Sequence, residues 1–470
     1  MKKALTPLPN FTQWLLLACV LMAAAMFAAP GSLAQTFRGS VIGTVTDSSG
    51  AAVPGATVTV KNEDTGLTRT TVTSEDGSYS VPELPVGKYD ITITKSGFQT
   101  ALTKAVRVDV AAQARVDTVL KPGEVNQQVV VSAESLPQVE TTSDTLGGGF
   151  QSEQVLSLPI NGRDYTKMLI MVPGANGEPN GGGDSPGSFG LFSANGNRGR
   201  ANNYLLDGTD MNDGYRNLPA INQGGVFGTP GTVLPLDAIS ELKVLSDFDS
   251  EYGRNSGSVV NIVTKSGTND LHGSVFDFFR NDHLNARNYF NTKDQPANPF
   301  RNNQFGGSIG GPIVKNKTFF FGAYEGQREG LAITSLNVVP SLADYAAAMG
   351  AIPGGDPSKC TTSAFTCVTT QNSGVVNQVV LNLYNFCNQS GKCSGGKDVW
   401  PAVNLAGVPP GAPNSSDPAS AFNNADSFIA KIDHTINSSN QISGRYFFGN
   451  SDQSFPLGLA GGNNLPNTNT

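Results

Sequence analysis

The sequence predicts a mainly β protein whose chain passes through several domains. Its 470 residues exceed one ordinary domain of about 100 to 200 residues. Glycine contributes 54 residues and charged residues only 15%, against about 25% in ordinary soluble domains, a balance that favours strands and turns over helices. Alternating apolar and polar segments indicate short sandwich strands early in the chain and long barrel-type strands later.

The formal net charge of −7 opposes nucleic-acid binding, because such a chain lacks the basic surface that neutralises phosphates. Enzymatic activity is not predicted either. The three histidines, His272, His283 and His434, are separated along the chain and lack the H-E-x-x-H spacing of a zinc hydrolase. We therefore predict no catalytic residue, no cofactor and no metal.

The first residues predict export. Two N-terminal lysines precede an apolar run over 14–29, and the small-residue pattern Ser32-Leu33-Ala34 follows it. This pattern is typical of a secretory signal peptide, here 1–34, cleaved before Gln35. A retained membrane anchor is the alternative, but the run is shorter than the ~20 apolar residues that span a bilayer.

Four cysteines lie close together in one polar stretch of the exported chain: Cys360, Cys367, Cys387 and Cys393. An oxidising compartment favours disulfides, and three connectivities remain open. A zinc site is the alternative. The spacings C-x6-C and C-x5-C are longer than those of the usual zinc knuckle.

Residues 38–121 predict a separate β-sandwich, because short alternating strands are broken by turn residues. Two runs, Val53-Pro54-Gly55-Ala56 and Asp76-Gly77-x-Tyr79, carry a resemblance to the carboxypeptidase regulatory-like domain, which has a transthyretin-like fold. That family is grouped with carbohydrate-binding folds, so Tyr79, Tyr89 and Phe98 are candidate stacking faces for a sugar. A role in the sandwich core is the alternative for these aromatic residues.

A short β-branched run follows a Pro-Gly linker. The run is similar to the TonB box, the segment that pairs with a periplasmic energising protein, and it comprises Val129, Val130, Val131, Ser132 and Ala133. Strand addition would be its mode of binding. The first strand of the next domain is the alternative, because one valine-rich run does not separate the two.

Residues 125–270 carry the most specific resemblance. Leu158-Pro159-Ile160-Asn161-Gly162-Arg163, then Tyr204-Leu205-Leu206-Asp207-Gly208, then Val259-Val260-Asn261-Ile262-Val263-Thr264 look like the plug domain of TonB-dependent receptors of the Oar-like group. In that family the plug is a compact α/β domain inside the barrel. The last two segments read locally as strands, with Gly-rich loops between them.

Charged residues of this region are candidates for contacts between the plug and the barrel wall, whose lumen is polar: Arg198, Arg200, Glu251 and Arg254. Solvated loop charges are the alternative, and direct ligand contact is a third. Asp207, Asp210, Asn212 and Asp213 resemble a set of calcium ligands in composition, but the EF-hand spacing is absent and Asp-Gly loops are ordinarily turns.

Residues 271–470 predict the N-terminal part of an outer-membrane β-barrel. Expected hairpin strands are 304–312 with 318–328, and a second pair lies on either side of the turn 437–440. In the second pair Phe428, Ile432 and their alternates form an apolar face, whereas Lys431 and Asp433 lie on the polar face. A long cysteine-containing loop is expected over 337–424.

We count five barrel strands, against about 22 in plugged transporters, so an incomplete barrel and an N-terminal fragment are predicted. The fold class is therefore mainly β, with a transthyretin-like sandwich, an α/β plug and the first strands of a barrel. The resemblance implies a Gram-negative outer-membrane transporter that imports an unknown ligand by energy-coupled plug movement. Its partners would be a TonB-type protein, the lipid bilayer and the ligand, for which an oligosaccharide is one candidate. An adhesion or structural protein, or a carbohydrate-binding surface module, is the alternative.

Overall fold

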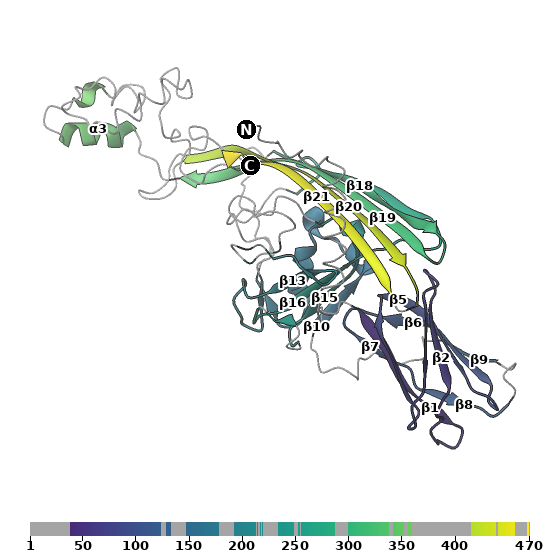
Figure 1. The fold of residues 1–470 in the computed structure, drawn as a ribbon. Coiled ribbons are helices and arrows are strands. Elements are labelled where there is room, and N and C mark those ends of the chain that lie inside the picture. The colour runs from purple at the N-terminus through teal and green to yellow at the C-terminus, as the bar shows by residue number, and fades with distance from the viewer. Residues whose placement is uncertain are drawn as a thin grey trace, which may run out of the picture. The chain divides into compact units, whose positions relative to one another are not determined.

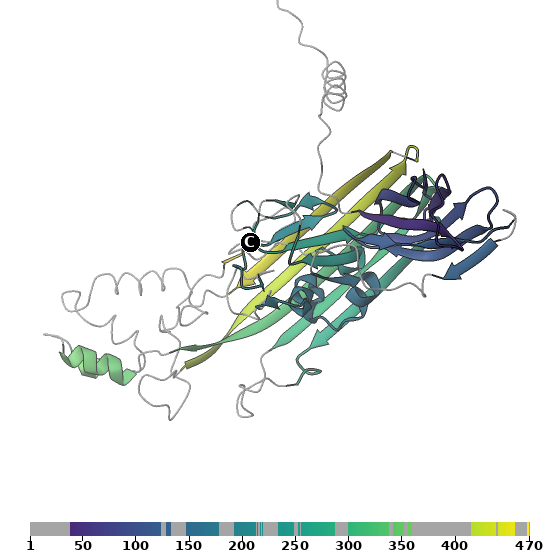
Figure 2. The same ribbon diagram turned by 90° about the horizontal axis from the view of Figure 1, so that it is seen from below.

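The computed structural model is mainly β, and the elements that it describes are coloured in Figures 1 and 2. The predicted signal peptide, Ala133, Glu251, Arg254 and the four loop cysteines lie outside the described residues. No helix in the described part is long and apolar enough to cross a membrane. The described residues are 38–123, 128–132, 147–177, 192–212, 214, 217, 219, 234–248, 252–253, 255–286, 299–337, 342–351, 356–359, 415–438, 440–455 and 468–469.

The N-terminal strands form a sandwich of two sheets, as the turn pattern predicts. One sheet has the order β4-β1-β7, with β8 also paired to β1, and the other has the order β3-β2-β5-β6-β9. Val41 and Val81 from the first sheet and Val58 and Ile91 from the second are buried in one shared core. The strands are β1 (Gly39–Asp47), β2 (Thr57–Asn62), β3 (Thr68–Val72), β4 (Ser78–Leu84), β5 (Gly87–Thr94), β6 (Thr100–Val108), β7 (Gln113–Arg115), β8 (Thr118–Leu120) and β9 (Gln128–Ser132).

Residues 40–120 are expected to fold alone, because the sandwich core is built from this segment. The isolated segment should show β-type circular dichroism and a cooperative melt. Ile91→Ala, at a site 1% exposed, should lower the free energy of unfolding by about 2–5 kcal/mol. Val119→Ala, at a site 58% exposed, is the matched control and should change it by less than about 0.5 kcal/mol. A non-cooperative melt of the unmodified segment would contradict an independent domain.

Residues 147–264 form a central α/β unit around a mixed five-stranded sheet of order β10-β15-β16-β13-β14. All residues of β13 and β16 are buried, because both faces of the sheet are covered. This confirms the strands expected near 204–206 and 259–264. The elements are β10 (Gly147–Gln151), α2 (Ser152–Ser157), η2 (Asn161–Arg163), η3 (Tyr165–Met171), β11 (Ala175–Asn176), β12 (Ser193–Ala194), β13 (Asn203–Leu206), β14 (Thr209–Asp210), η5 (Leu236–Ala238), β15 (Ile239–Leu245) and β16 (Val259–Thr264).

The remaining strands form one six-stranded antiparallel sheet in sequence order, which we call the long-strand sheet. It curves over the central unit (Figure 1), and one of its faces packs against that unit through Phe321, Ala323 and Ile429. The opposite face exposes apolar side chains such as Val275 and Ile432. The strands are β17 (His272–Asn281), β18 (Phe300–Val314), β19 (Thr318–Asn337), β20 (Ser415–Thr435), β21 (Gln441–Phe455) and β22 (Thr468–Asn469).

The predicted hairpins are present, but the strands are longer than the sequence pattern indicates. The loop expected over 337–424 overlaps β20, which begins at Ser415 and pairs with the end of β19 at Asn337. The β20 side of that end, residues 415–420, lacks apolar alternation in its sequence, so only the backbone pairing reveals it, and the loop boundary at 424 is wrong. A helix, α3 (Leu342–Ala351), and a short turn, η7 (Pro357–Lys359), also lie within the expected loop.

Candidate functional site: the contacts of the central unit

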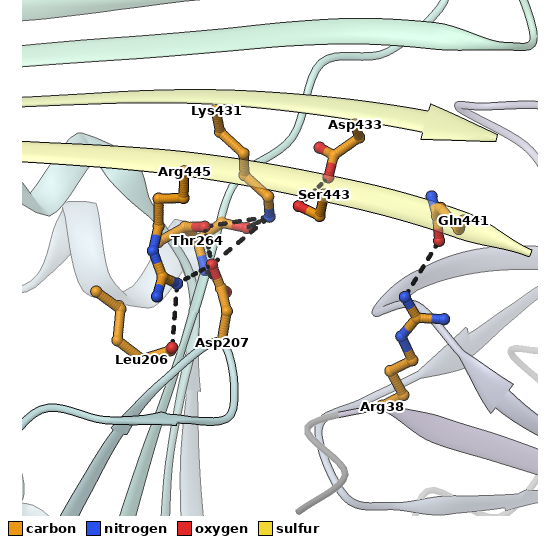
Figure 3. A network of polar contacts seen from close by, with 9 residues as sticks. All are labelled: Arg38, Leu206, Asp207, Thr264, Lys431, Asp433, Gln441, Ser443 and Arg445. Carbon is orange, nitrogen blue, oxygen red and sulfur yellow. Dashed lines mark hydrogen bonds and ion pairs between the residues drawn. The ribbon is translucent and has the colours of Figure 1, made fainter. Parts of the chain in front are cut away.

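Asp207 of the central unit lies at the centre of a polar cluster with the long-strand sheet (Figure 3). Its Oδ2 accepts a hydrogen bond from Arg445 Nη1 of β21 at 2.5 Å, and Lys431 Nζ of β20 lies 3.7 Å from the same oxygen. Arg445 also donates to the carbonyl oxygen of Leu206 at 3.0 Å, and Lys431 donates to Thr264 Oγ1 at 3.2 Å. Two cations of the sheet therefore hold one carboxylate of the central unit.

The local fold fixes Asp207 in this position. It follows β13 in a turn, where its backbone adopts a φ of +47° before Gly208. Its carboxylate accepts hydrogen bonds from Thr264 N at 2.8 Å and Thr264 Oγ1 at 2.6 Å, which tie the end of β13 to the end of β16. The carboxylate is therefore oriented from within the central unit before it meets Arg445.

Arg163 forms a second cluster at the same interface. Its guanidinium pairs with Asp237 of the central unit at 2.5 Å and with Glu325 of β19 at 3.2 Å. The guanidinium carbon also lies 4.0 Å from the centre of the Phe276 ring and 5.0 Å from that of Phe278, both on β17. The planar Arg side chain thus makes ion-pair and cation–π contacts at once, which lysine cannot reproduce.

Two further hydrogen bonds join the second cluster's surroundings to the long-strand sheet. Ser274 Oγ donates to Asp237 Oδ1 at 2.7 Å, and Gln304 Nε2 donates to the carbonyl oxygen of Gly162 at 2.9 Å. Ser274 and Gln304 belong to β17 and β18. Every strand from β17 to β21 therefore supplies a hydrogen bond, an ion pair or a ring contact to the central unit.

Both clusters are shielded from water. The side chains of Asp207 and Lys431 are 11% and 7% exposed, and those of Arg163 and Asp237 are 11% and 6% exposed. Removing one partner of such a pair leaves a charge without compensation, which costs about 3–5 kcal/mol. The arrangement can hold two bodies in register.

The opposite face of the central sheet contacts the sandwich. Glu241 Oε2 of β15 accepts a hydrogen bond from Val110 N at 3.1 Å, and Lys243 Nζ of the same strand donates to Val110 O at 3.0 Å. Burial and, to a smaller extent, the nearby Asp109 carboxylate raise the pKa of Glu241 to about 7, against the opposing effects of the hydrogen bond from Val110 and the charges of Lys243 and Arg107. We call this pair of contacts the Val110 clamp.

The Val110 clamp predicts pH-dependent docking of the sandwich. Between its ordinary pKa of 4.5 and about 7, docked Glu241 retains a proton that it has lost in the released state. Stability therefore falls as the pH rises through this window, by at most about 3 kcal/mol, because each pKa unit is worth about 1.4 kcal/mol. Thermal unfolding of the purified protein between about pH 5 and pH 8 should show this slope, and Glu241→Gln should flatten it. An equal slope in both proteins would assign the pH dependence to other groups.

The charged residues predicted to contact the barrel wall do not form the two clusters. Arg198 and Arg200 are exposed in the loop after β12, and among the described residues neither has an ion pair with the long-strand sheet. Their positions agree with the alternative of solvated loop charges. The described contacts instead use Asp207, weighed from sequence only as a calcium ligand, together with Arg163 and Arg445. The signal for Arg445 was its alternation with Gly444 and Tyr446, which places it on the polar face.

The TonB-box candidate forms β9 at the edge of the second sandwich sheet. It pairs in parallel with β6, from Thr100 opposite Gln128 to Lys104 opposite Ser132. Val130 is 56% exposed there. The alternative that this run begins the next domain is wrong in this structure, since its partner strand belongs to the sandwich.

The aromatic candidates for sugar stacking belong to the sandwich core. Tyr79 and Tyr89 are 5% and 0% exposed there, and their hydroxyl groups donate to the carbonyl oxygens of Val116 and Pro85. Phe98 is partly buried against the same core. Within the described residues no group of three or more acidic, His or Cys side chains is placed to hold a metal ion, and Asp207 is engaged by Arg445.

Comparison with known proteins agrees with this architecture. The family described as "Outer membrane beta barrel domain" matches residues 263–470, and the "Carboxypeptidase regulatory-like domain" matches residues 40–121. The chain is 28% identical over 310 residues to the TonB-dependent transporter Oar of Myxococcus xanthus. The chain is a relative of the Oar-like TonB-dependent receptors. The alignment covers 63% of this chain and 27% of the Myxococcus protein, so the chain spans about a quarter of that relative's length.

Solved structures with partial similarity include the siderophore receptor PirA from Acinetobacter baumannii, at 15% identity and a TM-score of 0.35, covering 67% of this chain and 32% of that one. A putative carbohydrate binding protein from Bacteroides uniformis matches at 20% identity and a TM-score of 0.16, over 18% of this chain and 41% of that one. The sequence relative is named as a transporter rather than an enzyme, and the match of the barrel family over residues 263–470 supports an outer-membrane location.

Proposed function

We propose that this chain belongs to an outer-membrane receptor that imports a ligand by energy-coupled movement of the central unit. In this proposal the central unit, within residues 125–270, is the plug, and residues 271–470 begin the barrel that surrounds it. The observation that carries the proposal is the pair of polar clusters around Asp207 and Arg163. They attach the central unit to the face of the long-strand sheet that lies opposite its exposed apolar residues.

A polar interface suits a part that must move and return. Ion pairs and hydrogen bonds at such a surface exchange for water contacts when the bodies separate, so their net contribution is modest although their geometry is specific. The apolar contribution of the sheet to the shared core consists of Phe321, Ala323 and Ile429, with Phe447 partly buried against it. Among the described residues, release therefore exposes these few apolar side chains of the sheet, while the polar contacts define the docked position.

The exposed face of the long-strand sheet suits lipid. Val275, Ile432 and Tyr446 are 92%, 53% and 62% exposed on it, and an apolar outer band with a polar lumen side is the pattern of outer-membrane barrels. The proposed location is the outer membrane of a Gram-negative bacterium, after cleavage of the signal peptide 1–34. The proposed partners are a TonB-type periplasmic protein, which pairs with residues 129–133, and an extracellular ligand.

Val130→Pro tests the import proposal in cells that express the protein from its complete gene. Proline removes an amide donor and fixes φ, so β9 should lose strand pairing with the energising protein while the central unit keeps its fold. Uptake should be abolished at normal outer-membrane abundance and normal surface binding of the ligand. Val130→Thr is the matched control, because it keeps the β-branch and the amide, and it should transport normally.

Unchanged uptake in Val130→Pro would place the coupling segment elsewhere in the chain. Absence of TonB-dependent uptake in the unmodified protein would favour the adhesion or structural role instead. Protein abundance, ligand binding and uptake must be measured in the same cells, because only this combination separates loss of coupling from loss of the receptor.

A further inference from the structure

The sandwich lies between the coupling segment and the central unit in the hydrogen-bond pattern of the protein. Strand β9 is bonded to β6 along Thr100–Lys104, and it lies at the end of the sheet order β3-β2-β5-β6-β9. On its other side β6 is bonded to β5. A partner strand that adds to the outer edge of β9 would therefore extend the sandwich sheet itself.

The chain leaves β6 directly at the Val110 clamp. β6 ends at Val108, and the backbone N–H and carbonyl oxygen of Val110 are bonded to Glu241 and Lys243, respectively. Val110 is 0% exposed, and the Glu241 and Lys243 side chains belong to residues only 3% and 9% exposed. Two buried ionisable side chains therefore hold the backbone N–H and C=O groups of Val110, which lies between β6 and β7.

Apolar packing supports the clamp. Ala111 packs against a buried cluster of the central unit formed by Leu205, Leu245, Tyr252 and Val259. Leu245 lies on the same strand as the two charged residues of the clamp. Main-chain, charged and apolar contacts therefore converge on residues 110–111.

The receiving strand is well placed to move the central unit. β15 is bonded to β10 on one side and to β16 on the other, and β16 is bonded in turn to β13, whose end holds Asp207. A displacement of β15 therefore acts on the sheet whose other face carries the contacts with the long-strand sheet.

We propose that the sandwich is a mechanical link: a pull on β9 passes through β6 and the Val110 clamp to β15. The inference rests on the proposed import function and adds a non-covalent route to the covalent connection along the chain, because the clamp joins the end of β6 directly to β15.

Uptake by the full receptor gives the first test. Glu241→Ala and Lys243→Met each remove one hydrogen bond to a charged group, so each should weaken the docking of the sandwich about ten-fold or more and reduce uptake by a comparable factor. Glu241→Gln keeps an acceptor for Val110 N and should retain uptake. Arg115→Ala breaks an exposed ion pair with Asp117 on the same sandwich and is the matched control. Ligand binding and outer-membrane abundance should be unchanged in all four variants.

Force spectroscopy on the membrane-embedded protein gives a readout that does not depend on transport. A handle at an exposed Lys121→Cys should load the clamp, so that in the parent protein the first rupture event includes the central unit. With Glu241→Ala the sandwich should separate first, at lower force, and release of the central unit should follow as a second event. Identical traces and identical uptake in Glu241→Ala would overturn the link. No TonB-dependent uptake in the parent protein would refute the import function alone, while the traces would still decide on the link.

Discussion

Asp207→Ala should strongly weaken the attachment of the central unit to the long-strand sheet. The substitution leaves Arg445 and the 7%-exposed Lys431 without their carboxylate, and loss of one partner of a buried pair costs about 3–5 kcal/mol. It also removes both acceptors of Thr264, which tie β13 to β16. Asp207→Asn should have a smaller effect, because its amide oxygen still accepts from Thr264 N.

The release can be followed as ion conductance of the protein in a lipid bilayer at increasing urea concentration. With ordinary urea dependences, a loss of about 3 kcal/mol lowers the midpoint of release by about 1–3 M. Arg38→Ala is a suitable control, because Arg38 belongs to the sandwich and not to the central unit. Its Nη2 donates to Gln441 Oε1 of β21 at 3.3 Å (Figure 3). Equal midpoints for Asp207→Ala and Arg38→Ala would show that the Asp207 cluster does not hold the central unit.

The sandwich was largely predictable from local sequence. Its strands alternate, and its hairpin at Asp76-Gly77 needs a glycine, because Gly77 has a φ of +79° and a Cβ there would lie 2.5 Å from the Val45 carbonyl oxygen. Strand alternation and turn glycines are set by neighbours within a few residues, so they can be recognised in the sequence. The pairing of β9 with β6 cannot be recognised in this way, because a valine-rich strand satisfies many possible neighbours.

The long-strand sheet was predictable in its faces but not in its contacts. Period-two alternation assigns Lys431 and Asp433 to one face and Ile432 to the other, and the burial of the strands agrees. The partner of Arg445, however, lies 238 residues away in the chain. Local pattern states which residues face inward, whereas the pairing of inward charges depends on how two separate bodies meet. The sequence suggested for Asp207 only a turn or a calcium site, and not an ion pair with the sheet.

A reversible cross-link between residues 207 and 445 tests the proposed movement most directly. Asp207→Cys with Arg445→Cys removes both partners of the pair together, which costs less than removing one, and Lys431 keeps its hydrogen bonds to Thr264. A short, reducible bifunctional thiol reagent should then bind the central unit to β21. Each single cysteine variant, treated in the same way, controls for reaction at the native loop cysteines.

We expect the cross-linked double variant to bind ligand at the cell surface and to import none, and we expect reduction to restore uptake to the level before treatment. Single variants should transport throughout. Uptake that continues at the normal rate while the link between residues 207 and 445 is intact would contradict import by movement of the central unit against the barrel wall.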